Sequence, residues 1–106
     1  MNEAQFTEQV IDLAHTLGWH VAHFHQSQIR PGVWVTPVKA DGKGFPDLVL
    51  VRDRLVVAEL KNDSKSNSRV TPEQQKWIGL LMTAGVEVYV WRPRDLDVIH
   101  DVLSRR

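Results

Sequence analysis

Apolar residues recur at helical spacing near the start of the chain. A helix is predicted over residues 3–17, because one side of it would carry Phe6, Val10, Leu13, Ala14 and Leu17. Asn2 with Gln5 three residues later can form a capping box, and Gly18 suits the C′ position that ends such a helix. The predicted helix is amphipathic and is expected to pack on a sheet.

Two further helices are predicted downstream. Thr71 suits the N-cap and Pro72 the first turn of a helix that runs to Ala84, with Gly85 as its stop. Trp77 on this helix is expected to lie in the core. A last amphipathic helix is predicted over about residues 95–103, and its apolar stripe contains Leu96, Ile99 and Leu103.

Strands are predicted over residues 19–24, 48–51, 55–58 and 86–91. The second and third of these are near-continuous aliphatic runs, which suits strands that are covered on both faces. Residues 25–46 form a long connection rich in Pro and Gly, in which a short strand or hairpin arm at 33–36 is possible. The order αβββαβα predicts an α/β fold with a mixed sheet of about four strands flanked by helices.

The hairpin between the two aliphatic strands brings charged residues together. If its loop is centred on Asp53, residue 47 pairs with residue 59, because the numbers of paired residues then sum to 106. Glu59 and Lys61 share one face of their strand, and Asp47 lies opposite Glu59 on that face. Two facing carboxylates are costly to desolvate unless a positive charge lies between them. The arrangement therefore predicts a divalent cation beside Lys61, as in a metal-dependent phosphodiesterase.

Composition and charge limit the other possibilities. At 106 residues the chain is expected to form one domain, and it has no cysteine, no apolar run of membrane-spanning length and no signal-peptide pattern. We expect the protein to be cytoplasmic, in a bacterium or in an infected host cell, and to have no membrane partner. The formal net charge is zero, but residues 26–70 contain eight basic residues against five acids. The electropositive part of the chain is therefore the part with the predicted site.

Several motifs together resemble the PD-(D/E)XK nuclease superfamily. Pro46-Asp47 is followed by Glu59-Leu60-Lys61, and the chain is similar to a small standalone VRR-NUC domain of the kind found in phages. The resemblance extends over nearly the whole length, through Gly18-Trp19, Gly44–Asp47, Ala58–Lys61, Thr71–Gln74 and Gly85–Pro93. It implies a restriction-endonuclease-like core.

The resemblance and the chemistry of the residues assign roles in a magnesium site. Asp47 and Glu59 would be ligands of Mg²⁺ or Mn²⁺, and the carbonyl of Leu60 a third. Lys61 could orient or deprotonate the attacking water, and positioning with charge stabilisation is favoured over general-base catalysis. Related nucleases also use an acid from the first helix. The apolar stripe favours Glu8 or the adjacent Gln9 here, whereas the local sequence EAQF points to Glu3.

Gln74 has two candidate roles, since it completes a capping box with Thr71 and its position in the family is commonly near the site. Gly44 would let the backbone approach DNA closely. Lys43, Lys65, Arg69 and Arg30 are expected to bind nucleic acid. A zinc site at His20, His23 and His25 is not favoured, because no cysteine or second ligand pair accompanies them.

The resemblance implies a Mg²⁺-dependent endodeoxyribonuclease. Small relatives resemble Holliday-junction resolvases, which implies a homodimer that acts on branched or four-way-junction DNA. A nicking or homing-type enzyme, or a flap or single-strand nuclease, is an alternative. A third hypothesis is a nucleic-acid-binding module that keeps the fold without turnover, although such a module has no need for two facing carboxylates.

Overall fold

The computed structural model describes residues 1–24, 27–35, 38–63 and 69–106. Its helices are α1 (Glu3–Thr16), α2 (Pro72–Thr83) and α3 (Leu96–Ser104), with a 3₁₀ turn η1 (Pro93–Asp95) before α3. Its strands are β1 (His20–His23), β2 (Ser27–Arg30), β3 (Val33–Val35), β4 (Leu48–Val51), β5 (Leu55–Leu60) and β6 (Glu87–Trp91). No helix in these ranges is long and apolar enough to cross a membrane.

Four strands form a mixed sheet in the order β1-β4-β5-β6. β4 is antiparallel to β1 and β5, whereas β5 and β6 run parallel. Leu48 pairs with Ala58 and Val51 with Leu55, so that both pairs of residue numbers sum to 106 as predicted. The predicted order αβββαβα is therefore confirmed for the sheet and its helices. β2 and β3 form a separate two-stranded hairpin, where the sequence indicated only one short strand or arm.

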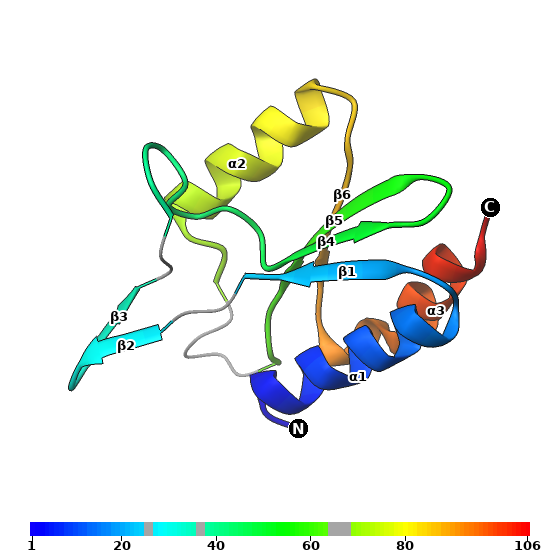
Figure 1. The fold of residues 1–106 in the computed structure, drawn as a ribbon, viewed down its shortest axis with the longest axis horizontal. Helices are drawn as coiled ribbons and strands as arrows, with labels where there is room; N and C mark the ends of the chain where they lie inside the picture. The colour runs from blue at the N-terminus through cyan, green and yellow to red at the C-terminus, as the bar shows by residue number, and fades with distance from the viewer. Residues whose placement is uncertain (25–26, 36–37, 64–68) are drawn as a thin grey trace.

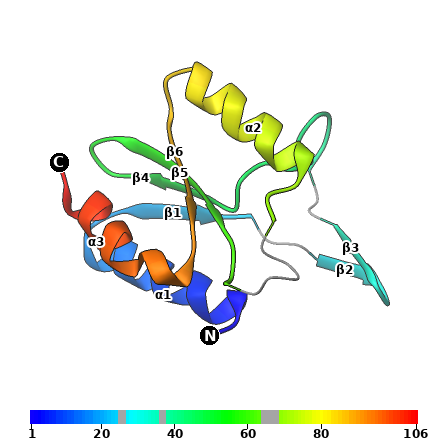
Figure 2. The same cartoon turned by 180° about the vertical axis from the view of Figure 1, so that it is seen from behind.

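Helices lie on both sides of the four-stranded sheet (Figure 1, Figure 2). α1 and α3 cover one face, where fully buried side chains from the helices and strands form the core: Phe6, Val10, Ala14, Leu48, Leu50, Val56, Ala58, Ile99 and Leu103. The apolar stripe predicted for the first helix is thus the packed one. The capping boxes at Asn2 and Thr71 are also formed.

The other face is covered less completely. α2 lies over it, yet none of the residues of this helix is buried (Figure 1). The prediction that Trp77 belongs to the core is therefore wrong. Trp77 is partly exposed, and its indole N–H donates to the carbonyl of Asp41 at 3.0 Å. Its ring contacts the ring of Phe45, outside the core.

The hairpin loop between β4 and β5 holds the end of α3. Arg52 donates hydrogen bonds to the carbonyl oxygens of Leu17 and Leu103, at 3.1 and 3.0 Å, and to that of Arg105. Its guanidinium lies 4.6 Å from the centre of the Trp19 ring, whose indole N–H also donates to Leu103. This loop lies at the end of the strands opposite Asp47. Arg52 therefore belongs to the structural framework and not to the electropositive surface of the predicted site.

Replacing Arg52 by Met is expected to lower the free energy of unfolding by about 2–3 kcal/mol. The change keeps the aliphatic stem but leaves buried carbonyls without a charged donor, and hydrogen bonds to charged groups contribute about 1.5–3 kcal/mol. Urea denaturation followed by circular dichroism measures the change. The control is Arg94→Met, which removes an exposed ion pair with Asp63 and is expected to cost less than about 1 kcal/mol. Equal effects of the two substitutions would contradict this role for Arg52.

Candidate active site

The ends of β4 and β5 bring Asp47, Glu59 and Lys61 together. Extending the register of the two strands places Asp47 opposite Glu59, and Lys61 follows two residues later on the same face. Glu59 and Lys61 are only 2% and 8% exposed, and the Lys61 ammonium Nζ lies 3.9 Å from Glu59 Oε1. Asp47 Oδ2 accepts a hydrogen bond from the Leu60 N–H at 2.8 Å. Two carboxylates and one ammonium thus lie together, and Glu59 and Lys61 among them are almost completely buried.

α2 supplies a fourth side chain to this group. Gln74 donates from Nε2 to Glu59 Oε1 at 2.9 Å, while its Oε1 accepts from the backbone N–H of Thr71 at 2.9 Å. The Gln74 backbone N–H in turn donates to the Thr71 hydroxyl at 3.2 Å. Gln74 therefore makes both of the contacts that the sequence left as alternatives. One amide side chain caps the helix and fixes the orientation of Glu59.

Both carboxyl groups have a raised pKa. Burial raises the pKa of Glu59 to about 9, and the negative charge of Asp47 acts in the same direction. Burial also raises the pKa of Asp47, although the Leu60 N–H and the charge of Lys61 oppose this shift. Without a cation, the pair is best accommodated when it holds a proton.

The donor set fits a hard divalent cation. Glu59 Oε2 is buried, and no group in the described part of the chain makes a hydrogen bond to it. No cluster of three or more His, Cys, Asp or Glu side chains in these ranges could hold a metal ion. Mg²⁺, however, needs only one or two carboxylates and keeps several waters. Asp47 and Glu59 meet that requirement.

The first helix contributes Glu3 to this neighbourhood, whereas the sequence favoured Glu8. Glu3 is exposed, but partial desolvation and the negative charge of Asp47 raise its pKa, and the charge of Lys61 opposes the shift. Glu8 is exposed and lies about 140° further around the helix. The apolar stripe was a poor guide, because the acid lies at the first turn of α1, beyond the stripe. The sequence EAQF pointed to this residue, and its role in the site stays a prediction.

The structure gives Gly44 a packing function. Its φ of 87° lies in the left-handed region, and an added Cβ would come within 2.6 Å of the Glu73 backbone. Close approach to α2 therefore requires glycine here, and close approach to DNA stays a prediction. Lys43 is exposed, 3.7 Å from Glu73 Oε1, and Arg30 and Arg69 are exposed as well. Lys65 lies outside the described residues.

A mixed sheet with helices on both sides and an Asp–Glu–Lys group at the ends of its central hairpin defines a restriction-endonuclease-like nuclease core. The sequence profile of the VRR-NUC domain matches residues 14–95, and the chain belongs to this family of nuclease-type, DNA-cleaving domains. No curated protein and no solved structure matches the chain. The match begins after most of α1 and does not include Glu3.

Proposed function

We propose that the protein is a Mg²⁺- or Mn²⁺-dependent endodeoxyribonuclease that cuts branched DNA as a homodimer. The observation that carries the metal dependence is the buried Glu59 Oε2, which receives no hydrogen bond from the described residues and faces a second carboxylate. A module that binds DNA without cutting it has no need for a buried pair of carboxylates that resist ionisation. A metal site has such a need, because a cation can replace the proton that the pair holds.

The residues divide the work of phosphodiester hydrolysis. Asp47, Glu59 and the Leu60 carbonyl would hold the cation; Leu60 N–H points to Asp47, and the carbonyl of the same residue leaves the strand on that side. When bound, the cation lowers the pKa of a water and stabilises negative charge on the phosphate. Lys61 places a second positive charge beside the same phosphate and orients the water. Gln74 keeps Glu59 in one rotamer.

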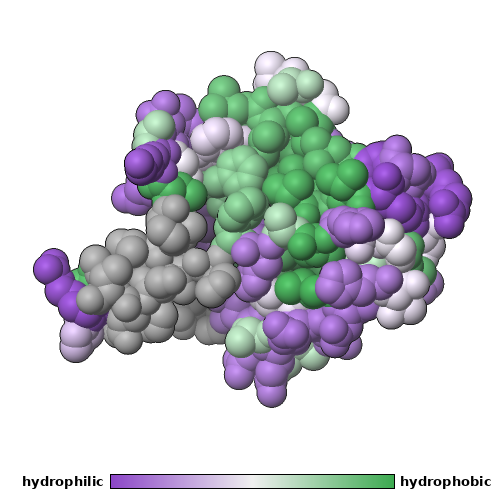
Figure 3. Space-filling model, in the orientation of Figure 1, coloured by the Kyte–Doolittle hydropathy of each residue, from purple (hydrophilic) through white to green (hydrophobic). Residues whose placement is uncertain are grey.

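The surface supports the homodimer and the preference for branched DNA. Large apolar side chains are exposed on α2 and on the β4–β5 hairpin, namely Leu80, Met82, Val51 and Leu55. Figure 3 shows apolar surface gathered over these elements. A domain of 106 residues has little surface for DNA, and two copies would supply two cutting sites for two strands.

A panel of DNA substrates tests the proposal. The purified protein is incubated with a four-way junction, a flap, single-stranded DNA and linear duplex, in Mg²⁺, Mn²⁺ or EDTA. We expect paired symmetric nicks on the junction, only with metal, and a dimeric mass in analytical ultracentrifugation. Cutting of another substrate in preference would select a flap, single-strand or nicking nuclease. Absence of metal-dependent cutting on all four substrates would refute the enzyme.

A further inference from the structure

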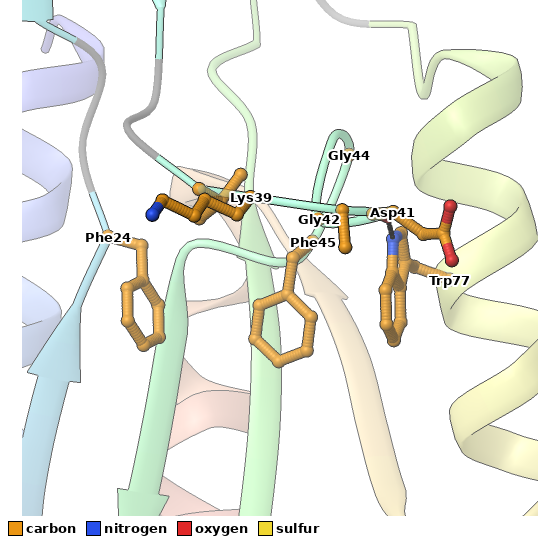
Figure 4. Close-up of a pocket in the computed structure, with 9 residues that line it drawn as sticks. Phe24, Lys39, Asp41, Gly42, Gly44, Phe45 and Trp77 are labelled. Carbon is orange, nitrogen blue, oxygen red and sulfur yellow. Dashed lines mark hydrogen bonds between the residues drawn. The ribbon is translucent and has the colours of Figure 1, made fainter.

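Three aromatic side chains form a row beside the candidate active site. The Phe45 ring lies between the other two, with its centre 5.7 Å from that of Phe24 and 5.1 Å from that of Trp77, and both contacts are edge-to-face. Figure 4 shows the three rings side by side beneath the loop of residues 38–44. Together they line a pocket of about 540 Å³.

Each of the three aromatic residues is linked to a residue of the candidate active site, either by a hydrogen bond or by its position in the chain. Phe24 donates its backbone N–H to the carbonyl of Asp47 at 2.8 Å, and Phe45 precedes Asp47 by two residues. Trp77 follows Gln74 by three residues on α2, which places both on the same side of the helix. The pocket therefore lies next to the Asp47–Glu59 group, although none of the residues that line it belongs to that group. A molecule held at that group lies close to the three rings.

Specific contacts hold the wall of the pocket in place. The indole N–H of Trp77 holds the carbonyl of Asp41, which fixes the loop across the row. Ala40 adopts a φ of 57°, an uncommon conformation for a residue with a side chain. Phe24 and Val38 nevertheless remain 39% and 42% exposed, so the row leaves apolar surface open to solvent. Lys39 lies at the Phe24 end of the pocket, where it can meet a phosphate (Figure 4).

We propose that this pocket takes one unpaired nucleobase of the DNA, from a nucleotide next to the phosphate that is cut. The inference rests on the proposed function, because it is the nuclease site that brings DNA to the rings. Aromatic side chains bind unstacked bases of any sequence through their faces. Bases at a branch point are easier to unstack than bases within a duplex. The pocket thus provides a physical reason for a preference for branched DNA.

A cycle of two changes tests the pocket: Phe24→Ala in the protein, and removal of one base from the DNA. Fluorescence anisotropy in EDTA, where no cutting occurs, measures the affinity for a junction with one abasic nucleotide, scanned through the positions around the branch. We expect one position at which removing the base weakens binding of the wild type about 5- to 150-fold, the range for one base on one aromatic ring. Phe24→Ala should weaken binding to the intact junction similarly, and should cause no further loss on that abasic junction.

Two controls make the outcome decisive. Val98→Ala removes another exposed apolar side chain, on α3, which neither lines the pocket nor belongs to the proposed dimer surface, and it should leave the cycle unchanged. Phe24→Leu keeps much of the apolar volume but has no aromatic face. It should therefore give the same result as Phe24→Ala, which shows that the result does not come from a fold loosened by the smaller alanine. Independent effects of the two changes at every position would refute the pocket. So would unchanged DNA affinity with a changed oligomeric mass, which would make the rings a protein interface.

The two proposals fail in different ways. A protein that shows the coupling but cuts no DNA in Mg²⁺ or Mn²⁺ refutes the nuclease and leaves the base pocket in place. A protein that cuts the junction with metal, yet shows no coupling at any position, keeps the nuclease and refutes the pocket.

Discussion

Replacing Lys61 by Met is expected to lower kcat for metal-dependent DNA cleavage by about 100- to 1,000-fold, the loss found when one preorganised charge-stabilising donor is removed. Lys61 is 8% exposed and its ammonium lies 3.9 Å from Glu59, so its charge acts in a space that excludes most water. Met has nearly the same length and apolar character as the lysine stem. The substitution therefore removes the charge with little change in packing.

Single-turnover cleavage of saturating junction DNA measures this effect, because it reports the chemical step apart from product release. Lys76→Met is the matched control, since Lys76 is exposed on α2 and its loss should leave kcat unchanged. Circular dichroism confirms that both variants are folded. A Lys61→Met protein that cuts at the wild-type rate would remove Lys61 from the site, even though the activity itself remained.

Replacing Glu59 by Gln is expected to abolish cleavage and to stabilise the metal-free protein at pH 8 by about 2 kcal/mol, within the range for relieving buried charges. The amide can still accept the hydrogen bond from Gln74, and its NH₂ group would take the position of Oε2, which receives no hydrogen bond from the described residues. There it can donate to Asp47. The burial and the charge of Asp47 that raise the pKa of Glu59 to about 9 then have no ionisable group to act on.

The same substitution should flatten the pH dependence of stability. The pKa of Glu59 is about 9 in the folded protein and near 4.5 in the unfolded chain, so the folded state binds more protons between these values. Stability from this group is fully present below pH 4.5 and is lost as pH rises toward 9. The slope for one proton is at most about 1.4 kcal/mol per pH unit.

Thermal unfolding of the wild type, of Glu59→Gln and of the exposed control Glu8→Gln, with and without Mg²⁺, measures both effects. The wild type and Glu8→Gln should lose stability with rising pH in EDTA and should gain stability from Mg²⁺. Glu59→Gln should do neither. A Glu59→Gln protein that is less stable than the wild type in EDTA, or that still gains stability from Mg²⁺, would contradict this account of the carboxylate pair.

Local patterns predicted most of this fold. The hairpin register followed from a short polar loop between two aliphatic runs, since pairing in an antiparallel hairpin is determined by where the loop is centred. The ends of α1 and α2 followed from capping residues, which act within three or four positions. These features depend on neighbours in the chain and can therefore be predicted from the sequence.

What the sequence did not predict depends on how distant segments pack. Trp77 has a large apolar side chain of the kind usually found in a core. However, the side chains of α2 leave the face of the sheet that they cover partly open, so the Trp77 ring lines a pocket. Glu3 reaches the neighbourhood of Asp47 because α1 begins near the ends of the strands, which the periodicity of the helix does not specify. Arg52 and Arg54 contributed to a basic segment in the sequence, yet they hold α3 at the far end of the hairpin.

The capping box of α2 has a consequence for how the domain tolerates change. Gln74 connects Glu59 to the first turn of a helix that has no buried residue. Glu59 itself belongs to the most deeply buried strand, β5. The geometry of the site therefore depends on the stability of the first turn of α2, a helix with no buried residue. Substitutions that fray this turn would inactivate the domain while its core stayed folded, so sequence drift along α2 would be limited by activity and not by folding.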